Sequence, residues 1–135
     1  MIKIKYKAYI KEHNKIVDVV DLTFLKDKDG EDWISVVVEH EENIFSEYDL
    51  ELVKLLPYSN LDDENKRELY LGDVILFNED EYGKIEIDEN GGFYVKCADC
   101  LSPINSFKRD MVKFNYLPKY IGNIYTEPKL EKKIR

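Results

Sequence analysis

The sequence predicts a mainly β protein of antiparallel strands, with a small SH3-like barrel in the C-terminal part and a strand-rich N-terminal lobe. Short segments in which apolar and polar residues alternate indicate strands with one buried face. Turn residues separate these segments at short intervals, as is typical of small antiparallel β folds. We therefore expect a single domain over residues 1–135, consisting of an N-terminal β lobe (1–55), a small β-barrel (56–128) and a basic tail (129–135).

The N-terminal lobe begins with an alternating segment in which lysines fill most of the polar positions. The apolar positions of this predicted strand are Ile2, Ile4, Tyr6, Ala8 and Ile10. After a polar turn at His13-Asn14, residues 15–25 continue the β-rich pattern. Asp29-Gly30 is the strongest hairpin dipeptide in the sequence, so we expect residues 33–38 to form the returning strand.

Residues 46–56 fit two interpretations. Ser46 with Asp49 is compatible with a helix cap, and the leucines at 52, 55 and 56 have helical spacing. Residues 50–56 also fit a strand, which is the interpretation we favour. We expect Pro57 to end either element, because proline has no backbone N–H to donate.

The stretch from residue 58 to residue 77 organises the rest of the chain. Residues 62–68 are almost wholly charged or amide, so we expect this loop to lie in water. Leu69 and Tyr70 return to the core, and Gly72 allows a sharp turn at positive φ. Residues 73–77 then form a strand rich in branched and aromatic side chains.

Further strands are predicted toward the C-terminus. Residues 84–88 alternate, Asn90-Gly91-Gly92 is a tight turn, and residues 93–96 complete a second hairpin. We expect another strand from the alternating set Val112, Phe114 and Tyr116. The last strand spans residues 120–125, with Gly122 as a bulge or a site of close approach. Pro128 ends it, and the tail that follows is expected to fray.

Three sequence blocks, in this order, resemble one known family. Lys5-Tyr6-Lys7-Ala8-Tyr9 is similar to K-F-R-A-W, and residues 120–130 are similar to V-I-G-N-I-Y-E-N-P-E-L. Residues 58–75 are similar to Y-T-G-L-K-D-K-N-G-K-E-I-Y-E-G-D-I-V, with matches at Tyr58, Leu61, Asp63, Asn65, Glu68, Tyr70, Gly72 and Asp73. The pattern resembles the YopX family of phage and prophage proteins over nearly the whole chain. Because the resemblance runs directly from residues 46–56 into the central block, it favours a strand there.

The chain departs from the family pattern at three positions of the central block. Asn60 and Lys66 stand where the family usually has glycine, and Leu71 replaces an acidic residue. Asparagine tolerates left-handed backbone conformations, whereas lysine at position 66 predicts a changed loop shape. The resemblance implies a phage or prophage origin and no particular activity.

The charge is acidic overall and unevenly distributed. The net charge is -8, residues 28–51 hold nine acidic side chains against one lysine, and residues 91–135 carry +5. An acidic total repels phosphate backbones, which disfavours generic nucleic-acid binding. No apolar run has the length of a membrane span, and no signal peptide is evident. We therefore expect a soluble cytoplasmic protein of a bacterial host cell, with no membrane partner and with both cysteines reduced.

Cys97-Ala98-Asp99-Cys100 is the only arrangement with metal or redox spacing. A lone pair supplies two of the four ligands of a structural zinc site, and His13 and His40 lie far away in the sequence. A thioredoxin-like role needs the pair at a helix N-terminus in an α/β context. Two reduced thiols at a strand end or turn are favoured, and a metal site shared between subunits is the alternative.

No residues form a recognisable catalytic pattern, so we predict a protein that is not an enzyme and has no catalytic, cofactor-binding or metal-binding residues. The acidic residues Glu79-Asp80-Glu81 and Glu39 with Glu41-Glu42 fit solvated turns, because acid–base catalysis needs desolvated groups in fixed positions. No P-loop, nucleophile elbow or dinucleotide fingerprint is present. The sixteen Tyr and Phe residues fit a β core and its rim, as an alternative to base stacking.

The predicted function is that of a non-catalytic phage or prophage accessory protein, which acts as an interaction or assembly module. We expect a homo-oligomer that engages an unknown host or phage protein, because exposed strand edges and segregated charge both favour association. The alternative is a nucleic-acid-binding barrel that uses the basic C-terminal part, with contacts from Lys108, Arg109, Lys113 and Lys119.

Overall fold

The computed structural model describes residues 5–134, which divide into two compact units at the Pro57–Tyr58 bond. The predicted apolar positions Ile2 and Ile4 lie outside the described residues. Each unit has its own buried apolar cluster and is described by itself. Most of the regular structure is antiparallel strand, so the prediction of a mainly β protein is confirmed.

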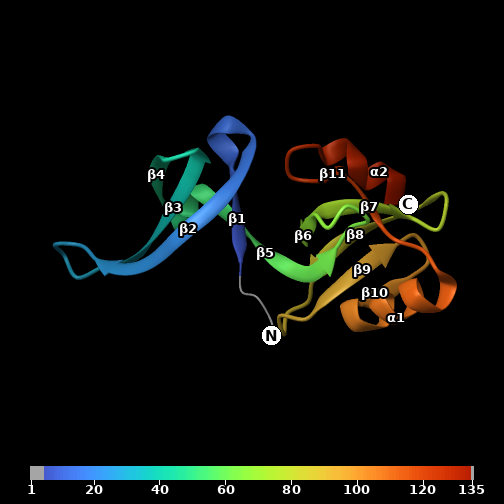
Figure 1. The fold of residues 1–135 in the computed structure, drawn as a ribbon. Helices are drawn as coiled ribbons and strands as arrows, with labels where there is room; N and C mark the ends of the chain where they lie inside the picture. Colours follow the sequence, from blue (N-terminus) through green and yellow to red (C-terminus); the bar gives the residue numbers. More distant parts are fainter. Residues whose placement is uncertain (1–4, 135) are drawn as a thin grey trace. The chain divides into compact units, whose positions relative to one another are not determined.

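The N-terminal unit, residues 5–57, is an antiparallel sheet in the order β4-β3-β2-β1-β5. Its core is formed by small and branched side chains, which fit a pleated sheet: Ala8, Ile10, Val17, Val36, Val38 and Val53. Figure 1 shows β2 and β3 as a long hairpin. The turn between them contains Asp29-Gly30, where Gly30 has a φ of +80°. The predicted hairpin is confirmed. The elements are β1 (Tyr6–Ile10), the 3-10 helix η1 (Lys11–His13), β2 (Lys15–Lys26), β3 (Asp32–Glu41), β4 (Ile44–Asp49), the 3-10 helix η2 (Leu50–Leu52) and β5 (Val53–Asp62).

Residues 46–56 are strand on both sides of one short turn. β4 ends at Asp49, whose side chain accepts a hydrogen bond from the Glu51 backbone N–H at 3.0 Å and so caps η2. The strand interpretation is confirmed for the flanking residues. Pro57, by contrast, lies inside β5, so the prediction that it ends the element is wrong. It is the last residue of β5 that pairs with β1, and Tyr58 next to it pairs with β6. A proline is tolerated where a strand exchanges one partner for another, because the ladder is interrupted there.

The C-terminal unit, residues 58–134, is built on a five-stranded antiparallel sheet in the order β10-β9-β8-β7-β11. Among residues 5–134 no pairing joins the edge strands β10 and β11, so the sheet is open where a small closed barrel was predicted. The second hairpin, β8–β9, and the strand after Gly72 are confirmed. The elements are β6 (Glu68–Tyr70), β7 (Asp73–Phe77), β8 (Glu81–Ile87), β9 (Phe93–Cys97), β10 (Leu101–Pro103), α1 (Ile104–Phe114), β11 (Lys119–Asn123), the 3-10 helix η3 (Pro128–Leu130) and α2 (Glu131–Ile134).

The strand predicted from Val112, Phe114 and Tyr116 is wrong, because residues 104–114 form the helix α1. Ile104 and Phe107 are buried, and Met111 packs against the same cluster, at the spacing of one helix face. Val112 and Phe114 are instead 85% and 62% exposed. Tyr116, the third member of the alternating set, lies beyond the helix and packs against the core. In the described part of the chain, no helix is long and apolar enough to cross a membrane.

The basic tail is helical over its described residues, where we expected a frayed end. Pro128 opens η3, and α2 follows directly. Proline suits this position because its fixed φ matches the first residue of a helix. Leu130 and Ile134 are buried against Val74, four residues apart on one helical face. These two apolar residues therefore pack the lysine-rich tail against the sheet.

The charged loop at residues 62–68 is mostly exposed, as predicted, but one of its carboxylates is buried. Asp63 is 8% exposed, and its side chain accepts hydrogen bonds from the backbone N–H groups of Asn65 and Arg67 at 2.9 and 2.8 Å. The Tyr120 N–H is a further donor at 3.4 Å. Asn60 and Lys66, the two departures from glycine in the family pattern, both adopt positive φ, at +67° and +66°. The left-handed turns are therefore kept without glycine.

Gly72 and Gly91 offer a matched test of packing at positive φ, since their φ angles are +86° and +83°. A Cβ on Gly72 would lie 2.8 Å from the Tyr125 ring, whereas one on Gly91 would meet nothing within 4 Å. We expect Gly91→Ala to cost about 1 kcal/mol of unfolding free energy from backbone strain. Gly72→Ala should cost roughly 1–3 kcal/mol more, because the Tyr125 ring must move.

Urea titrations followed by the NMR signals of β7 and β11 measure both losses in the unit that contains these glycines. Equal losses for the two variants would show that Tyr125 does not constrain the Gly72 turn.

Candidate functional site

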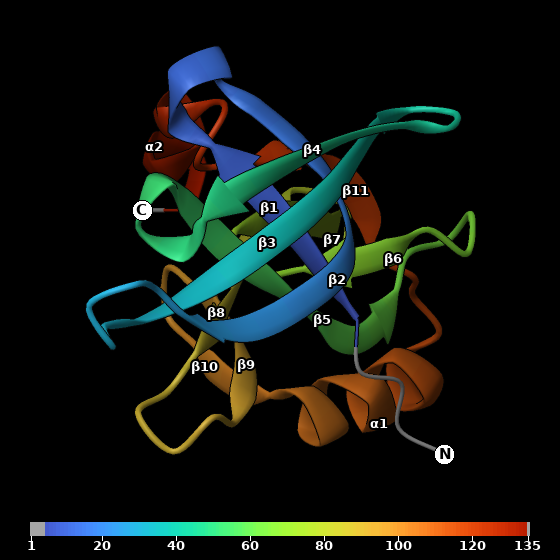
Figure 2. The same ribbon diagram turned by 90° about the vertical axis from the view of Figure 1, so that its left-hand side faces the viewer.

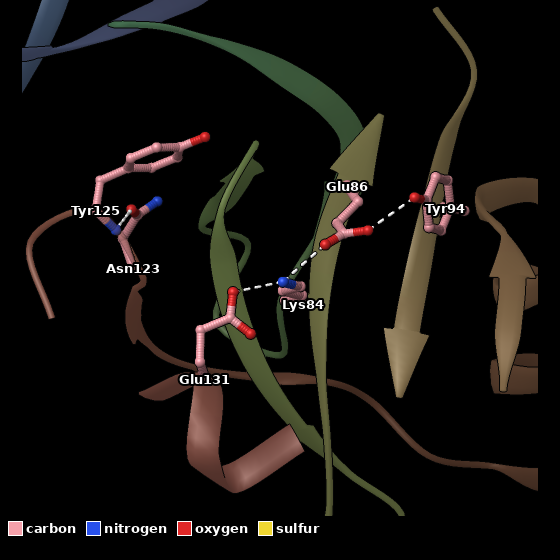
Figure 3. A network of polar contacts seen from close by, with 6 residues as sticks. All are labelled: Lys84, Glu86, Tyr94, Asn123, Tyr125 and Glu131. Atoms are coloured by element: carbon pink, nitrogen blue, oxygen red, sulfur yellow. Dashed lines mark hydrogen bonds and ion pairs between the residues drawn. The ribbon is translucent and has the colours of Figure 1, made fainter. Parts of the chain in front are cut away.

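One polar cluster of the C-terminal unit is centred on Lys84 of β8 (Figure 3). The Lys84 side chain is buried, and its Nζ lies 2.7 Å from Glu86 Oε1 and 2.5 Å from Glu131 Oε1. The Tyr94 hydroxyl donates to Glu86 Oε2 at 2.7 Å. Lys84 and Glu86 are two residues apart and so share one face of β8, and Tyr94 is the direct cross-strand neighbour of Glu86 on β9. Glu131, the first residue of α2, joins the C-terminal helix to this face.

The ionisation of this cluster follows from its partners. Burial lowers the pKa of Lys84, but its hydrogen bonds to Glu131 and Glu86 outweigh burial and raise it above the ordinary value. Burial raises the pKa of Glu86, yet the bonds from Lys84 and Tyr94 outweigh it and the pKa is lowered. Lys84 is therefore held as an ammonium between two carboxylates. Such a group fixes α2 on the sheet, and it is not poised to act as a base or a nucleophile.

A second polar centre, Asn123 at the end of β11, is almost fully buried and uses both ends of its amide. Its Nδ2 donates to the Leu71 carbonyl at 3.1 Å and to Asp73 Oδ1 at 2.9 Å. Its Oδ1 accepts from the Tyr125 N–H at 2.8 Å. Asp73 Oδ2 accepts from the Tyr70 N–H at 2.7 Å. We call these contacts the Asp73–Asn123 junction. It joins the central and C-terminal sequence blocks that carry the family resemblance.

Cys97 and Cys100 are joined in a disulfide, against the expectation of two reduced thiols. Their Cα atoms are 5.0 Å apart, which lies within the range that a disulfide spans. The Cys97 N–H donates to the Cys100 carbonyl at 3.1 Å, so the β9–β10 turn is closed by a backbone bond as well. His13 and His40 belong to the N-terminal unit, whereas the two cysteines belong to the C-terminal unit.

The candidate carboxylates lie in turns or at the strand ends beside them. Glu79 and Asp80 occupy the exposed β7–β8 turn and Glu81 begins β8, whereas Glu42 lies in the β3–β4 turn and Glu41 is the last residue of β3. Glu39 accepts a 3.4 Å hydrogen bond from the Asn43 N–H of that turn. Over residues 5–134 no three His, Cys, Asp or Glu side chains gather in a group that would fit a metal ion.

The four basic residues proposed as nucleic-acid contacts are brought partly together. Lys108, Arg109 and Lys113 lie on α1, and Lys119 begins β11. Arg109 Nη2 donates to Ser106 Oγ at 3.2 Å, and Lys113 Nζ lies 5.3 Å from the centre of the Phe114 ring. Sequence reasoning found these residues but placed part of this segment in a strand.

An open hollow of about 630 Å³ lies beside the start of α1 and was not predicted. Its lining includes Tyr58, Asp62, Phe93, Asn105 and Lys108. The Tyr58 hydroxyl donates to Asp62 Oδ1 at 2.6 Å, and burial together with this bond raises the pKa of Tyr58 above its ordinary value. The tyrosine therefore stays protonated and donates to its neighbour, so the hydroxyl proton on this wall of the hollow is already used within the protein.

Sequence reasoning also missed Lys84, Glu86 and Asn123. The alternation of residues 84–88 places Lys84 and Glu86 on one face, so their pairing had a signal. Glu131 had none, because its partner is 47 residues away and the helix that carries it was expected to fray.

These features define a mainly antiparallel β protein with two compact units and a clamped C-terminal helix. The family model for YopX protein matches residues 5–131, so the chain belongs to the YopX family and the resemblance is confirmed. None of the curated proteins compared with the chain matches it. The crystal structure of protein EF1440 from Enterococcus faecalis is similar at 18% sequence identity, with a TM-score of 0.57 over 96% of this chain and 99% of that one. That likeness shows the fold.

The Lys84 cluster predicts how the stability of the C-terminal unit depends on pH. The pKa of Glu86 is lower when folded than its ordinary 4.5, so its stabilisation is present above pH 4.5 and is lost as the pH falls through the lower folded value. For Lys84 the sign is opposite, and stabilisation is lost only as the pH rises through a value above 10.5. We expect Glu86→Gln to make the unfolding free energy of this unit depend less steeply on pH in the acidic range.

Urea titrations at a series of pH values, followed by the NMR signals of β8 and β9, measure this dependence. Glu89→Gln, at an exposed position of the adjoining turn, is the matched control. It should leave the pH dependence of the unfolding free energy in the acidic range as in the wild type. The same slope in the Glu86→Gln protein and the wild type would refute the assignment.

Proposed function

We propose that this YopX-family chain is a non-catalytic phage or prophage accessory protein that acts as an interaction and assembly module and self-associates. The supporting observation is the edge strand β4. It ends the N-terminal sheet on one side, next to β3 (Figure 2). Two of its apolar side chains are about half exposed.

Within residues 5–134, β4 pairs on one side only, with β3, and its other side combines an open backbone edge with apolar side chains. Ile44 and Phe45 are 52% and 51% exposed, and they follow directly on the β3–β4 turn. Phe24 on the neighbouring hairpin is 81% exposed. Soluble proteins usually protect long edge strands, because the free N–H and C=O groups offer pairing to another chain. Apolar residues at such an edge support a role in association.

The non-catalytic part of the proposal is supported by the state of the ionisable groups. Lys84, Glu86 and Glu131 are engaged with one another, and Tyr58 donates to Asp62. The buried carboxylate Asp63 is occupied by backbone N–H groups. Acid–base catalysis needs a titratable group beside a cavity that can still bind or release a proton of the substrate. The groups named here use their hydrogen bonds and charges within the fold. We place the protein in the cytoplasm of a bacterial host, where further partners would be phage or host proteins.

The oligomeric state tests self-association. We expect the wild-type protein at micromolar concentration to exceed monomer mass in light scattering. The double variant Ile44→Lys/Phe45→Lys should shift the distribution to monomer, because two ammonium groups replace the apolar edge. A wild-type protein that stays monomeric would contradict the proposal.

Leu52→Lys is the matched control for this experiment. Leu52 is 61% exposed but lies on η2, outside the edge strand. This variant should self-associate as the wild type does, so a loss of association in it would mean that added charge alone is responsible.

A second candidate is nucleic-acid binding, favoured by one observation: Lys108, Arg109 and Lys113 share one helix. If α1 contacts phosphates, binding to single-stranded DNA should fall steeply with salt. Neutralising Arg109 and Lys113 to Gln should weaken binding and reduce the salt slope by about two counterions. Fluorescence anisotropy measures both quantities. No binding at low salt would rule this candidate out.

A further inference from the structure

The end of α1 and the loop after it expose three large apolar side chains with basic residues beside them, while Asp110 and Glu81 line a hollow next to Phe114. Val112, Phe114 and Leu117 are 85%, 62% and 60% exposed. Arg109 and Lys113 are exposed on the same helix, and Asp110 is the helix's one acidic residue. We call Arg109, Val112, Lys113, Phe114 and Leu117 the α1 patch. Three large apolar side chains in water within six residues are typical of a surface that another molecule covers.

The edge strand β4 of the N-terminal unit also exposes apolar side chains, but the charged residues beside them are acidic. Ile44 and Phe45 are flanked by Glu42 in the turn and Glu47 on β4, both exposed. Residues 29–53 contain no lysine or arginine. We call Glu42, Ile44, Phe45 and Glu47 the β4 patch.

Each patch is poorly suited to meet its own copy. Two β4 patches would bring glutamates together, and two α1 patches would bring an arginine and a lysine together with theirs. Like charges across an interface oppose association and select against the pairing, whereas opposite charges around apolar centres favour it.

We propose that copies of this chain associate head to tail, with the β4 patch of one copy lying on the α1 patch of the next. This inference rests on the proposed self-association and names the two surfaces that carry it. A contact between unlike patches is heterologous, so it closes into a ring or extends into a filament. Screening of the charges by salt should weaken it.

Charge reversal at each patch tests the pairing. One variant carries Arg109→Glu and Lys113→Glu, and the other carries Glu42→Lys and Glu47→Lys. We expect each variant alone to associate about tenfold or more weakly than the wild type, because like charges then face each other. Mixing the two variants in equal amounts should restore association, since every junction in the mixture can again pair unlike charges. Analytical ultracentrifugation measures all three samples.

A control variant with Lys129→Glu and Lys132→Glu changes the net charge by the same amount at another exposed basic surface, on η3 and α2. It should associate like the wild type. Restored association on mixing also shows that both reversed variants are folded, and circular dichroism of each alone checks this independently.

The outcomes separate this inference from the proposed function. A monomeric wild type overturns both. Self-association that depends on Ile44 and Phe45 but is unchanged by Arg109→Glu/Lys113→Glu leaves the proposed function standing and overturns the head-to-tail pairing. Two weakened variants that fail to recover on mixing also overturn it. A loss confined to single-stranded DNA binding in the α1 variant would assign that patch to nucleic acid instead.

Discussion

The C-terminal unit depends on the Asp73–Asn123 junction. One amide and one carboxylate, both buried, satisfy each other and three backbone groups across 50 residues of sequence. Buried polar groups are stabilising only when their hydrogen-bonding capacity is met, and a half-satisfied set would cost more than an apolar one. The Gly72 turn beneath the Tyr125 ring supplies the space for this arrangement. The two sequence blocks that identify the family therefore meet in the fold, and this contact accounts for Gly72, Asp73 and Asn123 within them.

Local signals explain what the sequence could predict. The hairpins at Asp29-Gly30 and Gly91-Gly92 and the strand after Gly72 were found because turn chemistry and alternation act over a few residues. The helix α1 was missed because an alternating set, Val112 and Phe114, overlapped a helical set that also fits the segment. Asp63 was placed in water because a charge is costly to bury, but two turn N–H groups compensate it locally.

The candidate site was harder to predict than the fold. The basic residues of α1 could be named from composition, yet their arrangement required the helix. The Lys84 cluster depends on α2, which packs through Leu130 and Ile134 in a tail rich in lysine. The Cys97–Cys100 bond departs from the expectation for a reducing compartment, because sequence spacing alone does not report oxidation state. Contacts between residues far apart in the sequence produce no periodic pattern from which they could be predicted.

The exchange of partners at Pro57 bears on cooperativity. β5 takes its backbone hydrogen bonds from β1 up to Pro57 and from β6 beyond it, so each compact unit holds its own ladder. Separate ladders and separate apolar clusters allow separate melting transitions, in which case a single midpoint would not describe the whole chain. Trp33, the only tryptophan, belongs to β3 in the N-terminal unit. Its fluorescence therefore follows one half of the molecule, while the tyrosine-rich other half can unfold without changing that signal.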